Sequence, residues 1–427
     1  MRTDVLMRFG PGFFLLQIGT TLSESSSHLF RLALAWWCLK ETQSAVTFSS
    51  LIALSVATEV YLKPFLASFG DQFNRIKFIV CCQLAVTAMI MLFCIACTAG
   101  HFHIIAVTTG ALVMSAVVSV REPTIMGLIP DLVRDGEISR AISNRSAINS
   151  VIMVSGPVLA TTLISLFSAG IALYVAAMLQ GLSCLAFAAL TKKVSAPFLL
   201  SGENWFSKTK GGFTAIYRVK SEFHIALIST VINFTMFPFF SVTVPFWIST
   251  ELHLPASYLG AFEFSFALGL LAGSLYLNTA IRALLGRFWN VVAGFLLLGG
   301  SVIGIVMAPN IYVSIALASF SGLAFIFINV NLSTLRTTAT PRHYRTRMNA
   351  MAAFISTLAN PFGVMIAGWY IHCLGITPFA IFSGIAVILV APIPFLSWHL
   401  KSALSLEEFE MRGYYEKTYP NAFIERV

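Results

Sequence analysis

Long runs of apolar residues alternate with short polar stretches along most of this 427-residue chain. A helix needs about 20 apolar residues to cross the hydrocarbon core of a bilayer, and these runs reach that length. The runs are continuous, whereas the strands of a membrane barrel alternate between apolar and polar positions, so the pattern predicts helices. The predicted spans are residues 12–38, 45–67, 78–98, 103–127, 144–167, 170–190, 223–248, 256–279, 289–308, 311–332, 348–371 and 376–398.

The predicted spans form two groups of six, and a similar polar pattern opens the fifth span of each group. This pattern consists of Arg140, Asn144, Gly156 and Pro157 in the first group, and of Arg345, Asn349, Pro361 and Gly363 in the second. Internal repetition of this kind is typical of transporter folds. We therefore expect an all-α polytopic membrane protein with 12 transmembrane helices in two pseudo-symmetric six-helix bundles. The predicted parts are an N-terminal bundle (1–190), a cytoplasmic linker (191–222), a C-terminal bundle (223–398) and a cytoplasmic tail (399–427).

Composition and charge agree with a membrane protein. Charged residues make up 11% of the chain, against about 25% in an ordinary soluble domain. The net charge of +9 is spread between the apolar runs, so it does not indicate a nucleic-acid partner. Loops rich in Lys and Arg stay in the cytoplasm. All 27 of these residues except Arg31, Lys40, Lys63 and Arg121 fall in the N-terminus, the even-numbered loops or the tail, which predicts that both termini are cytoplasmic.

The two segments outside the bundles carry their own signals. The linker mixes lysines and arginines with aromatic residues, which suits either a helix on the anionic membrane surface or a solvated tether. In the tail, Ser405 and Glu408 resemble a capping box and Gly413 a helix stop, which predicts one short helix between them.

Ionisable residues within membrane spans are costly, so each is a candidate for substrate binding or ion coupling. In the first span, Glu24, His28 and Arg31 share one helix face. They could line a cavity in which Glu24 carries a proton and Arg31 meets an anionic group, or they could form an intrahelical ion pair that only fixes packing. In the second span, Glu59 and Lys63 have the spacing of a salt bridge that either acts at a gate or is structural.

Further polar candidates lie in later spans. Arg121 and Glu122 are adjacent in the fourth span and point about 100° apart, so one of them should bond to another helix. Arg121, like Arg31, is also a candidate to contact an anionic group of the substrate. Glu263 has no Lys or Arg in its own span and is either the partner of a distant cation or a protonatable group. Asn233 and Asn360 could contact substrate or hydrogen-bond between helices.

The sequence offers no catalytic or cofactor signature. The seven cysteines lie in or beside apolar runs, and the CxxC of Cys94 and Cys97 has no companion pair, so we expect neither disulfides nor a metal site. No HExxH and no GxxxxGK[ST] motif occurs, which excludes ATP hydrolysis by a phosphate-binding loop of this kind. We expect no cofactor and no enzyme activity, and a gradient-driven mechanism remains.

Several motifs carry a family resemblance over nearly the whole chain. They are LALAWWCLKETQSA, ASFGDQFNRIKF, REPTIMGLIPDLV, ISRAISNRSA, VPFWIST, LGAFEFSFALGLLAGSL and RTRMNAM. In order and spacing they resemble the major facilitator superfamily, and within it the bacterial drug and siderophore efflux branch, which includes macrolide efflux proteins and the enterobactin exporter.

The resemblance implies a secondary active transporter of an amphipathic small molecule, a drug or a siderophore, in the bacterial inner membrane. It implies proton-coupled export by alternating access, a central cavity lined by spans one, four, seven and ten, and a monomer as the default state. It also implies gate roles for Asp71 and Arg75, although Ala67, Gln72 and Ile76 depart from the family's gating motif. Two alternatives remain open: import of a siderophore or nutrient by the same fold, and a membrane sensor that transports nothing.

Overall fold

The structure is a computed structural model, and it describes residues 10–66, 75–133, 138–191, 205–341, 344–407 and 410–423. The ordered elements of this part are helices. Packing divides the chain into two compact units. The first unit comprises Met1–Gly202 with Pro245–Phe264, and the second comprises Glu203–Val244 with Ser265–Val427.

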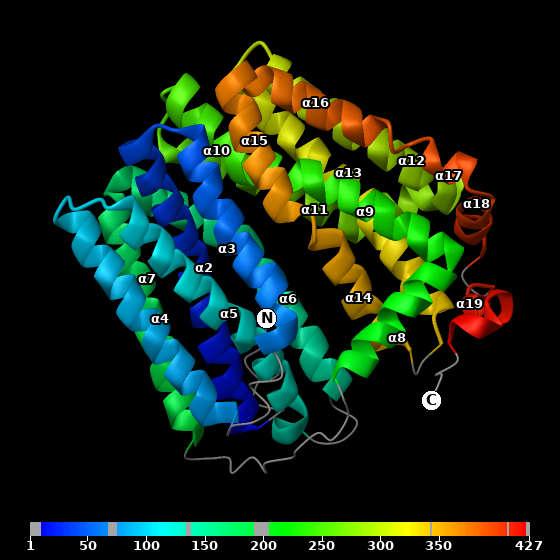
Figure 1. The fold of residues 1–427 in the computed structure, drawn as a ribbon, viewed down its shortest axis with the longest axis horizontal. Coiled ribbons are helices and arrows are strands. Elements are labelled where there is room, and N and C mark those ends of the chain that lie inside the picture. Colours follow the sequence, from blue (N-terminus) through cyan, green and yellow to red (C-terminus); the bar gives the residue numbers. More distant parts are fainter. Residues whose placement is uncertain are drawn as a thin grey trace. The chain divides into compact units, whose positions relative to one another are not determined.

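The first unit is built from six long helices, coloured blue to teal in Figure 1. They are α2 (Pro11–Thr42), α3 (Ala45–Leu66), α4 (Arg75–Thr98), α5 (Ile104–Leu132), α6 (Ile138–Leu166) and α7 (Ala169–Thr191). Helix α7 packs along both α2 and α4, and α3 packs on α5. Completely buried side chains, among them Phe13, Ile79, Leu128 and Phe187, fill the space between α2, α4, α5 and α7.

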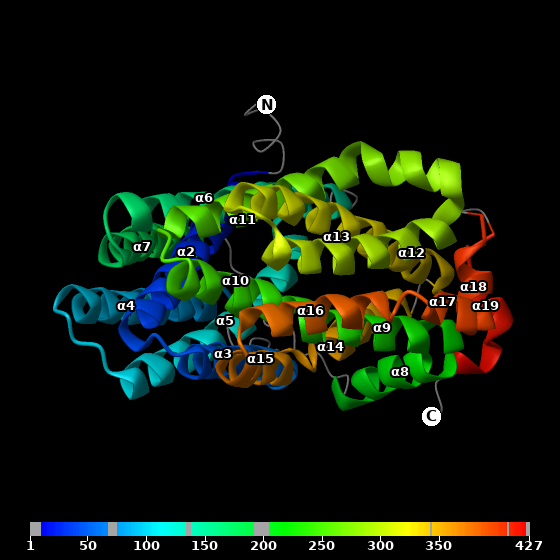
Figure 2. The same ribbon diagram turned by 90° about the horizontal axis from the view of Figure 1, so that it is seen from above.

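The second unit contains the remaining long helices, coloured green to red. They are α8 (Trp205–Arg218), α9 (Lys220–Pro238), α12 (Asn278–Met307), α13 (Ile311–Ala339), α14 (Arg345–Thr357), α15 (Asn360–Leu374) and α16 (Ile376–Ile388). Helices α12 and α13 lie side by side in both ribbon views (Figures 1 and 2) and pack closely. Short π-helical segments interrupt the regular helix at η2 (Phe239–Thr243), η3 (Trp247–Glu251) and η4 (Gly273–Leu277).

Helix α11 (Ala256–Ala272) belongs to both units, because its residues up to Phe264 group with the first unit and the rest with the second. In the second unit it meets α13 through two glycines. A Cβ added at Gly269 would collide with the carbonyl oxygen of Ser319, and one at Gly322 with that of Phe266. Small residues at such a crossing let two membrane helices approach backbone to backbone.

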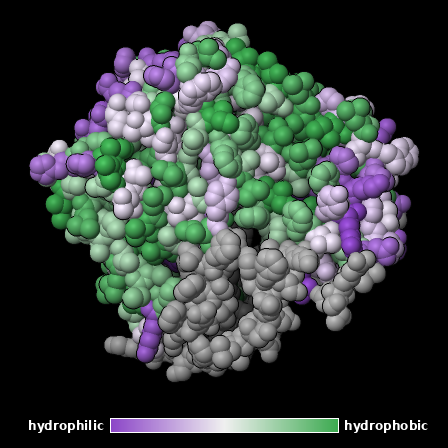
Figure 3. All heavy atoms as spheres, in the orientation of Figure 1, coloured by the Kyte–Doolittle hydropathy of each residue, from purple (hydrophilic) through white to green (hydrophobic). Residues whose placement is uncertain are grey.

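The predicted spans 12–38, 78–98, 170–190 and 311–332 each fall within one observed helix, whereas the span 348–371 is divided between α14 and α15 and the span 376–398 continues past the end of α16. By length and composition, eight described segments could each cross a membrane: Ala45–Leu62, Ile76–Thr98, Ala169–Thr191, Lys220–Glu251, Ala256–Met307, Ile311–Ala339, Arg347–Leu374 and Ile376–Leu396. Two further apolar stretches are shorter than these eight: Ile104–Ser119 in α5 and Ser155–Leu166 in α6. The count of twelve membrane helices therefore stays a prediction. Apolar side chains cover most of the described part of the face drawn in Figure 3, as expected for a surface in contact with lipid.

The tail differs from its prediction. Ser405 ends a helix, α18 (Trp398–Leu404), and does not begin one, while the described residues 410–413 form turns. Gly413 has a φ of 67° and precedes α19 (Tyr414–Thr418), so it starts the next helix. Glu408 lies outside the described residues. The local capping pattern was misleading because packing against the second unit, which buries Leu404 and Met411, sets the path of the tail.

The linker region contains one described helix, α8. Its residues Gly212, Ala215 and Ile216 are buried, and a Cβ at Gly212 would press on the backbone of Arg347 in α14. Phe213 and Tyr217 are exposed on the other face. Helix α8 is thus amphipathic, and its proposed position on a membrane surface stays a prediction.

Candidate transport site

An ion pair between two helices forms the centre of the candidate site in the first unit. Arg121 Nη2 on α5 lies 2.9 Å from Glu24 Oε1 on α2, and Arg121 Nη1 donates to the hydroxyl of Ser23. The Arg121 side chain is only 3% exposed, whereas that of Glu24 is 28% exposed. A buried charge needs a partner, and Glu24 supplies one for Arg121. The sequence left open an ion pair within α2, but the structure pairs Glu24 with α5.

Ser23 extends the ion pair into a buried chain of hydrogen bonds. Its hydroxyl donates to Gln180 Oε1 on α7 over 3.2 Å, and Gln180 Nε2 donates to Gln83 Oε1 on α4 over 2.7 Å. Gln83 Nε2 in turn donates to Ser183 Oγ over 2.7 Å, and the Ser183 hydroxyl donates to the carbonyl of Gly19 over 2.6 Å. Ser23, Gln83, Gln180 and Ser183 are all completely buried. The chain ties α2, α4 and α7 together behind the Glu24–Arg121 pair.

His28 and Arg31 lie further along the same face of α2. Arg31 Nη2 is 3.3 Å from His28 Nδ1, and the Arg31 side chain is exposed. His28 packs against α6, where a Cβ at Gly156 would come within 3.0 Å of the imidazole. The three residues that the sequence grouped on one face therefore have different neighbours: Glu24 pairs with α5, His28 packs against α6, and Arg31 is exposed beside His28.

Glu263 lies on the part of α11 that belongs to the first unit. Gly260, one turn earlier on α11, sits directly against Thr161 of α6, so close that a Cβ would collide with the threonine hydroxyl. Glu263 is half-buried, and its carboxylate interacts electrostatically with Arg31. Both roles that the sequence left open for Glu263, the partner of a distant cation and a protonatable group, stay predictions.

The remaining site predictions have mixed outcomes. Asn233 donates through Nδ2 to the carbonyl of Ser229 in its own helix over 2.8 Å, and Asn360 is buried at the start of α15. Glu59 is exposed on α3. Asp71, predicted to act at the gate, lies outside the described residues, as do the side chains of three further candidates: Lys63, Arg75 and Glu122.

The second unit contains a buried cluster that the sequence did not single out. Glu222 of α9 is completely buried, and its Oε2 lies 2.7 Å from Arg336 Nε of α13. Its Oε1 accepts a 2.8 Å hydrogen bond from the hydroxyl of Tyr415, which is also completely buried. Burial and the neighbouring Glu222 raise the pKa of Tyr415 well above its usual value of 10.0, so this hydroxyl stays protonated and donates.

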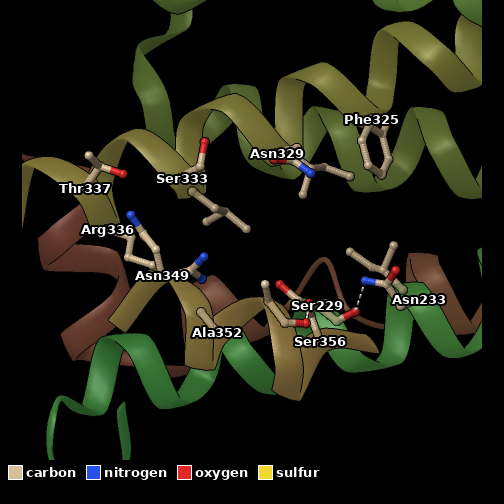
Figure 4. Close-up of a pocket in the computed structure, with 14 residues that line it drawn as sticks. Ser229, Asn233, Phe325, Asn329, Ser333, Arg336, Thr337, Asn349, Ala352 and Ser356 are labelled. Atoms are coloured by element: carbon tan, nitrogen blue, oxygen red, sulfur yellow. Dashed lines mark hydrogen bonds between the residues drawn. The ribbon is translucent and has the colours of Figure 1, made fainter. Parts of the chain in front are cut away.

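Arg336 also lines a pocket of about 340 Å³ within the second unit, between α9, α13 and α14 (Figure 4). Amide and hydroxyl side chains dominate its polar lining. The lining residues are Ser229, Ile232, Asn233, Phe325, Ile328, Asn329, Leu332, Ser333, Arg336, Thr337, Asn349, Ala352, Ala353 and Ser356. Asn233 is the one residue of this pocket that the sequence had proposed as a contact to substrate. Among the described residues, no group of three or more His, Cys, Asp or Glu is placed to hold a metal ion.

Long apolar helices with an ion pair and polar groups buried between them define an integral membrane protein built for transport. The chain belongs to the major facilitator superfamily, whose family model matches residues 13–225. It is therefore a secondary transporter and a multi-pass bacterial membrane protein, with a small molecule as its substrate.

Individual relatives are distant. Macrolide efflux protein A of Streptococcus pyogenes is 20% identical over 394 residues, which cover 89% of this chain and 94% of the relative. This match agrees with the resemblance to the drug efflux branch.

Solved structures share the fold at lower identity. A bacterial homologue of the iron transporter ferroportin, in an inward-facing state, superposes with a TM-score of 0.72 at 15% identity and covers 91% of this chain and 98% of its own. A bacterial homologue of the human lysosomal transporter Spinster gives 0.66 at 13% identity, with 98% and 100% covered.

Proposed function

We propose that this protein exports an amphipathic small molecule of the drug type from bacteria, and that protons moving inward drive the export. The observation that carries the proposal is the Glu24–Arg121 pair, which joins a partly exposed carboxylate to a buried guanidinium between two helices. The name of the macrolide efflux relative supports a drug-like substrate and an outward direction.

The pair has the properties that proton coupling requires. Glu24 is partly exposed and can exchange a proton with water, while Arg121 stays positively charged at any physiological pH. A proton on Glu24 removes one charge of the pair, while Arg121 keeps its hydrogen bond to Ser23. A ligand or proton shifts a conformational equilibrium only through a difference in binding energy between the two states. Making the ion pair in one state and breaking it in the other provides such a difference.

Transport by membrane vesicles tests this role. Wild-type protein in everted vesicles should accumulate a labelled macrolide when the lumen is acidified, and Glu24→Gln should abolish this accumulation while the protein remains in the membrane. Glu41→Gln is the matched control, because Glu41 lies on the same helix, exposed near its end. Accumulation by Glu24→Gln at the wild-type rate would exclude Glu24 as the proton carrier.

Right-side-out vesicles test the direction. Export predicts no gradient-driven uptake in them. Uptake of a siderophore there, with no macrolide movement in everted vesicles, would contradict export and identify the chain as an importer.

The topology and gate complete the proposal. We place the chain in the inner membrane as a monomer, with two bundles (1–190 and 223–398), a linker (191–222) and a tail (399–427) whose termini are both cytoplasmic. The excess of Lys and Arg in the even-numbered loops supports this orientation. Asp71 and Arg75 act at the cytoplasmic gate. A phosphatase reporter that is active only outside the cytoplasm should be inactive when fused to either terminus, and activity at either would contradict the orientation.

A further inference from the structure

The polar pocket of the second unit has an uneven charge. Arg336 is the single charged residue among the residues that line it. The other polar lining groups are amides and hydroxyls, of which Asn329, Ser333 and Thr337 lie on α13 with Arg336, and Asn349 lies on α14. The carboxylate that balances Arg336, Glu222, is completely buried and is not among the lining residues. A solute in this pocket therefore meets the cation and not its counter-charge.

The guanidinium of Arg336 keeps donors for a second acceptor. Its ion pair with Glu222 uses Nε, at 2.7 Å. A guanidinium has five N–H donors in a flat fork, so a group bound through Nε can still bind a carboxylate through its two Nη atoms. In the described part of the chain, the Arg336 side chain donates its hydrogen bond through Nε. The Nη atoms are thus available at the pocket.

Tyr415 determines how Glu222 can hold Arg336. Its hydroxyl occupies Oε1, which leaves Oε2 for the arginine. Without this hydrogen bond both carboxylate oxygens could turn to the guanidinium, and a bidentate contact would take up donors that now face the pocket.

The tail keeps Tyr415 in place through contacts on both sides of it. Arg287 Nη1 donates to the carbonyl of Leu406 over 3.2 Å, and Arg218 Nη1 donates to the carbonyl of Asn421 over 2.7 Å. Phe423 packs edge-on against Tyr344, with 5.4 Å between the ring centroids. These contacts attach the tail to α8, α12 and the start of α14, so the position of Tyr415 is set by the docked tail as a whole.

We propose that this pocket is an anion-accepting subsite in which Arg336 binds a carboxylate or other oxyanion group of the solute, and that Glu222 and the tail residue Tyr415 are positioning residues that aim Arg336 into it. As a part of the transport pathway, the subsite rests on the function proposed above. The chemistry itself can be tested on purified protein without any gradient.

The test measures the charge preference of the pocket with a reporter thiol. The seven native cysteines are replaced by serine, and Ser333→Cys places one thiol on the pocket wall, one helical turn from Arg336. Its rates of modification by an anionic reagent, sulfonatoethyl methanethiosulfonate, and by a cationic one, trimethylammonioethyl methanethiosulfonate, are measured in detergent. The ratio of the anionic to the cationic rate is divided by the same ratio at the exposed Cys373, retained as the sole cysteine in a parallel protein.

We expect this normalised ratio to exceed one, and to fall about tenfold in Arg336→Gln because reagents of opposite sign respond in opposite directions to the loss of one charge. Glu222→Gln should raise it. Tyr415→Phe keeps the buried ring and should lower the ratio two- to threefold. Tyr419→Phe is the matched control in the tail, since its hydroxyl lies 3.3 Å from His399 Nδ1 whereas that of Tyr415 binds Glu222, and it should change the ratio less than Tyr415→Phe does.

Three results would overturn the proposal. A thiol at 333 that reacts with neither reagent shows that solutes do not enter the pocket. A ratio unchanged by Arg336→Gln shows that this arginine does not set its charge. Equal ratios for Tyr415→Phe and Tyr419→Phe remove the positioning role of the tail, and Tyr415→Phe retains the core packing needed for that comparison. Failure of proton-driven export, by contrast, would leave all of these rates as they are.

Discussion

The buried pair Gln83–Gln180 allows the energy of the polar chain in the first unit to be measured. Both amides are completely buried, and a 2.7 Å hydrogen bond joins α4 to α7 through them. Replacing one amide by leucine, which has a similar volume, leaves the other without its partner. Replacing both amides removes the hydrogen bond and leaves neither amide unpaired. The losses in free energy of unfolding for the two single variants should therefore add up to more than the loss for the double variant.

The magnitude follows from counting the groups left behind. A buried polar group that loses its partner costs about 1–3 kcal/mol. Gln83→Leu strands Gln180 Nε2 and leaves Ser183 Oγ without its donor, for about 2 kcal/mol, and Gln180→Leu strands Gln83 Oε1 and the hydroxyl of Ser23, for about 3 kcal/mol. The double variant leaves the hydroxyls of Ser23 and Ser183 without these partners, for about 2 kcal/mol. The coupling between the two sites should then be about 3 kcal/mol, at the upper end for residues in contact.

Reversible unfolding in mixed micelles, titrated with a denaturing detergent, gives these free energies. Ser26→Ala is the control within the same interface, because its hydroxyl donates to the carbonyl of Ala176 and not to Gln180. Its effect should add to that of Gln180→Leu. If the effects of Gln83→Leu and Gln180→Leu also add, within about 0.5 kcal/mol, the two amides do not act as a unit and the reasoning is refuted.

Two further predictions concern the second unit. Gly269→Ala should lower the yield of folded protein and its thermal stability, because the added methyl meets the carbonyl of Ser319. Gly300→Ala, with nothing within 4 Å of its Cβ, should be neutral or stabilising. Equal behaviour of the two variants would contradict the close packing of α11 and α13. The tail should loosen at high pH, because the raised pKa of Tyr415 means that its contribution is complete below pH 10.0 and is lost as pH rises through the higher folded value. Limited proteolysis should show this alkaline release in wild type and not in Tyr415→Phe, and release at the same pH in both would assign it to another group.

The sequence predicted the helical fold well because the signal is physical and continuous. Apolar runs of membrane length leave the backbone no alternative to helix, and charges within them stand out. Glu24 and Arg121 could be named for this reason. Their pairing could not, because it depends on how α2 and α5 are rotated about their axes, which no local pattern fixes.

Other parts of the sites gave weaker signals. Gln83 and Gln180 are uncharged, and a single amide in an apolar run resembles an ordinary packing residue until its partner is seen. Glu222 follows Lys220 at the edge of the predicted linker and was assigned to a cytoplasmic segment, while Arg336 is 114 residues away in sequence and Tyr415 is 193. Sequence patterns over a few residues cannot show contacts between groups so far apart in the chain. In the tail, tertiary packing determined the structure around Ser405, and the local capping pattern did not.

The pH dependence of substrate binding tests the central claim most directly. Binding of a labelled macrolide to purified protein in detergent is measured by equilibrium dialysis across a series of pH values. If a proton on Glu24 breaks the pair with Arg121 and opposes substrate binding, wild type and Glu41→Gln should lose affinity as the pH falls, and Glu24→Gln should bind with an affinity that does not change with pH. The same loss of affinity in Glu24→Gln would contradict the account, because the competing proton would then bind a group other than the partner of Arg121.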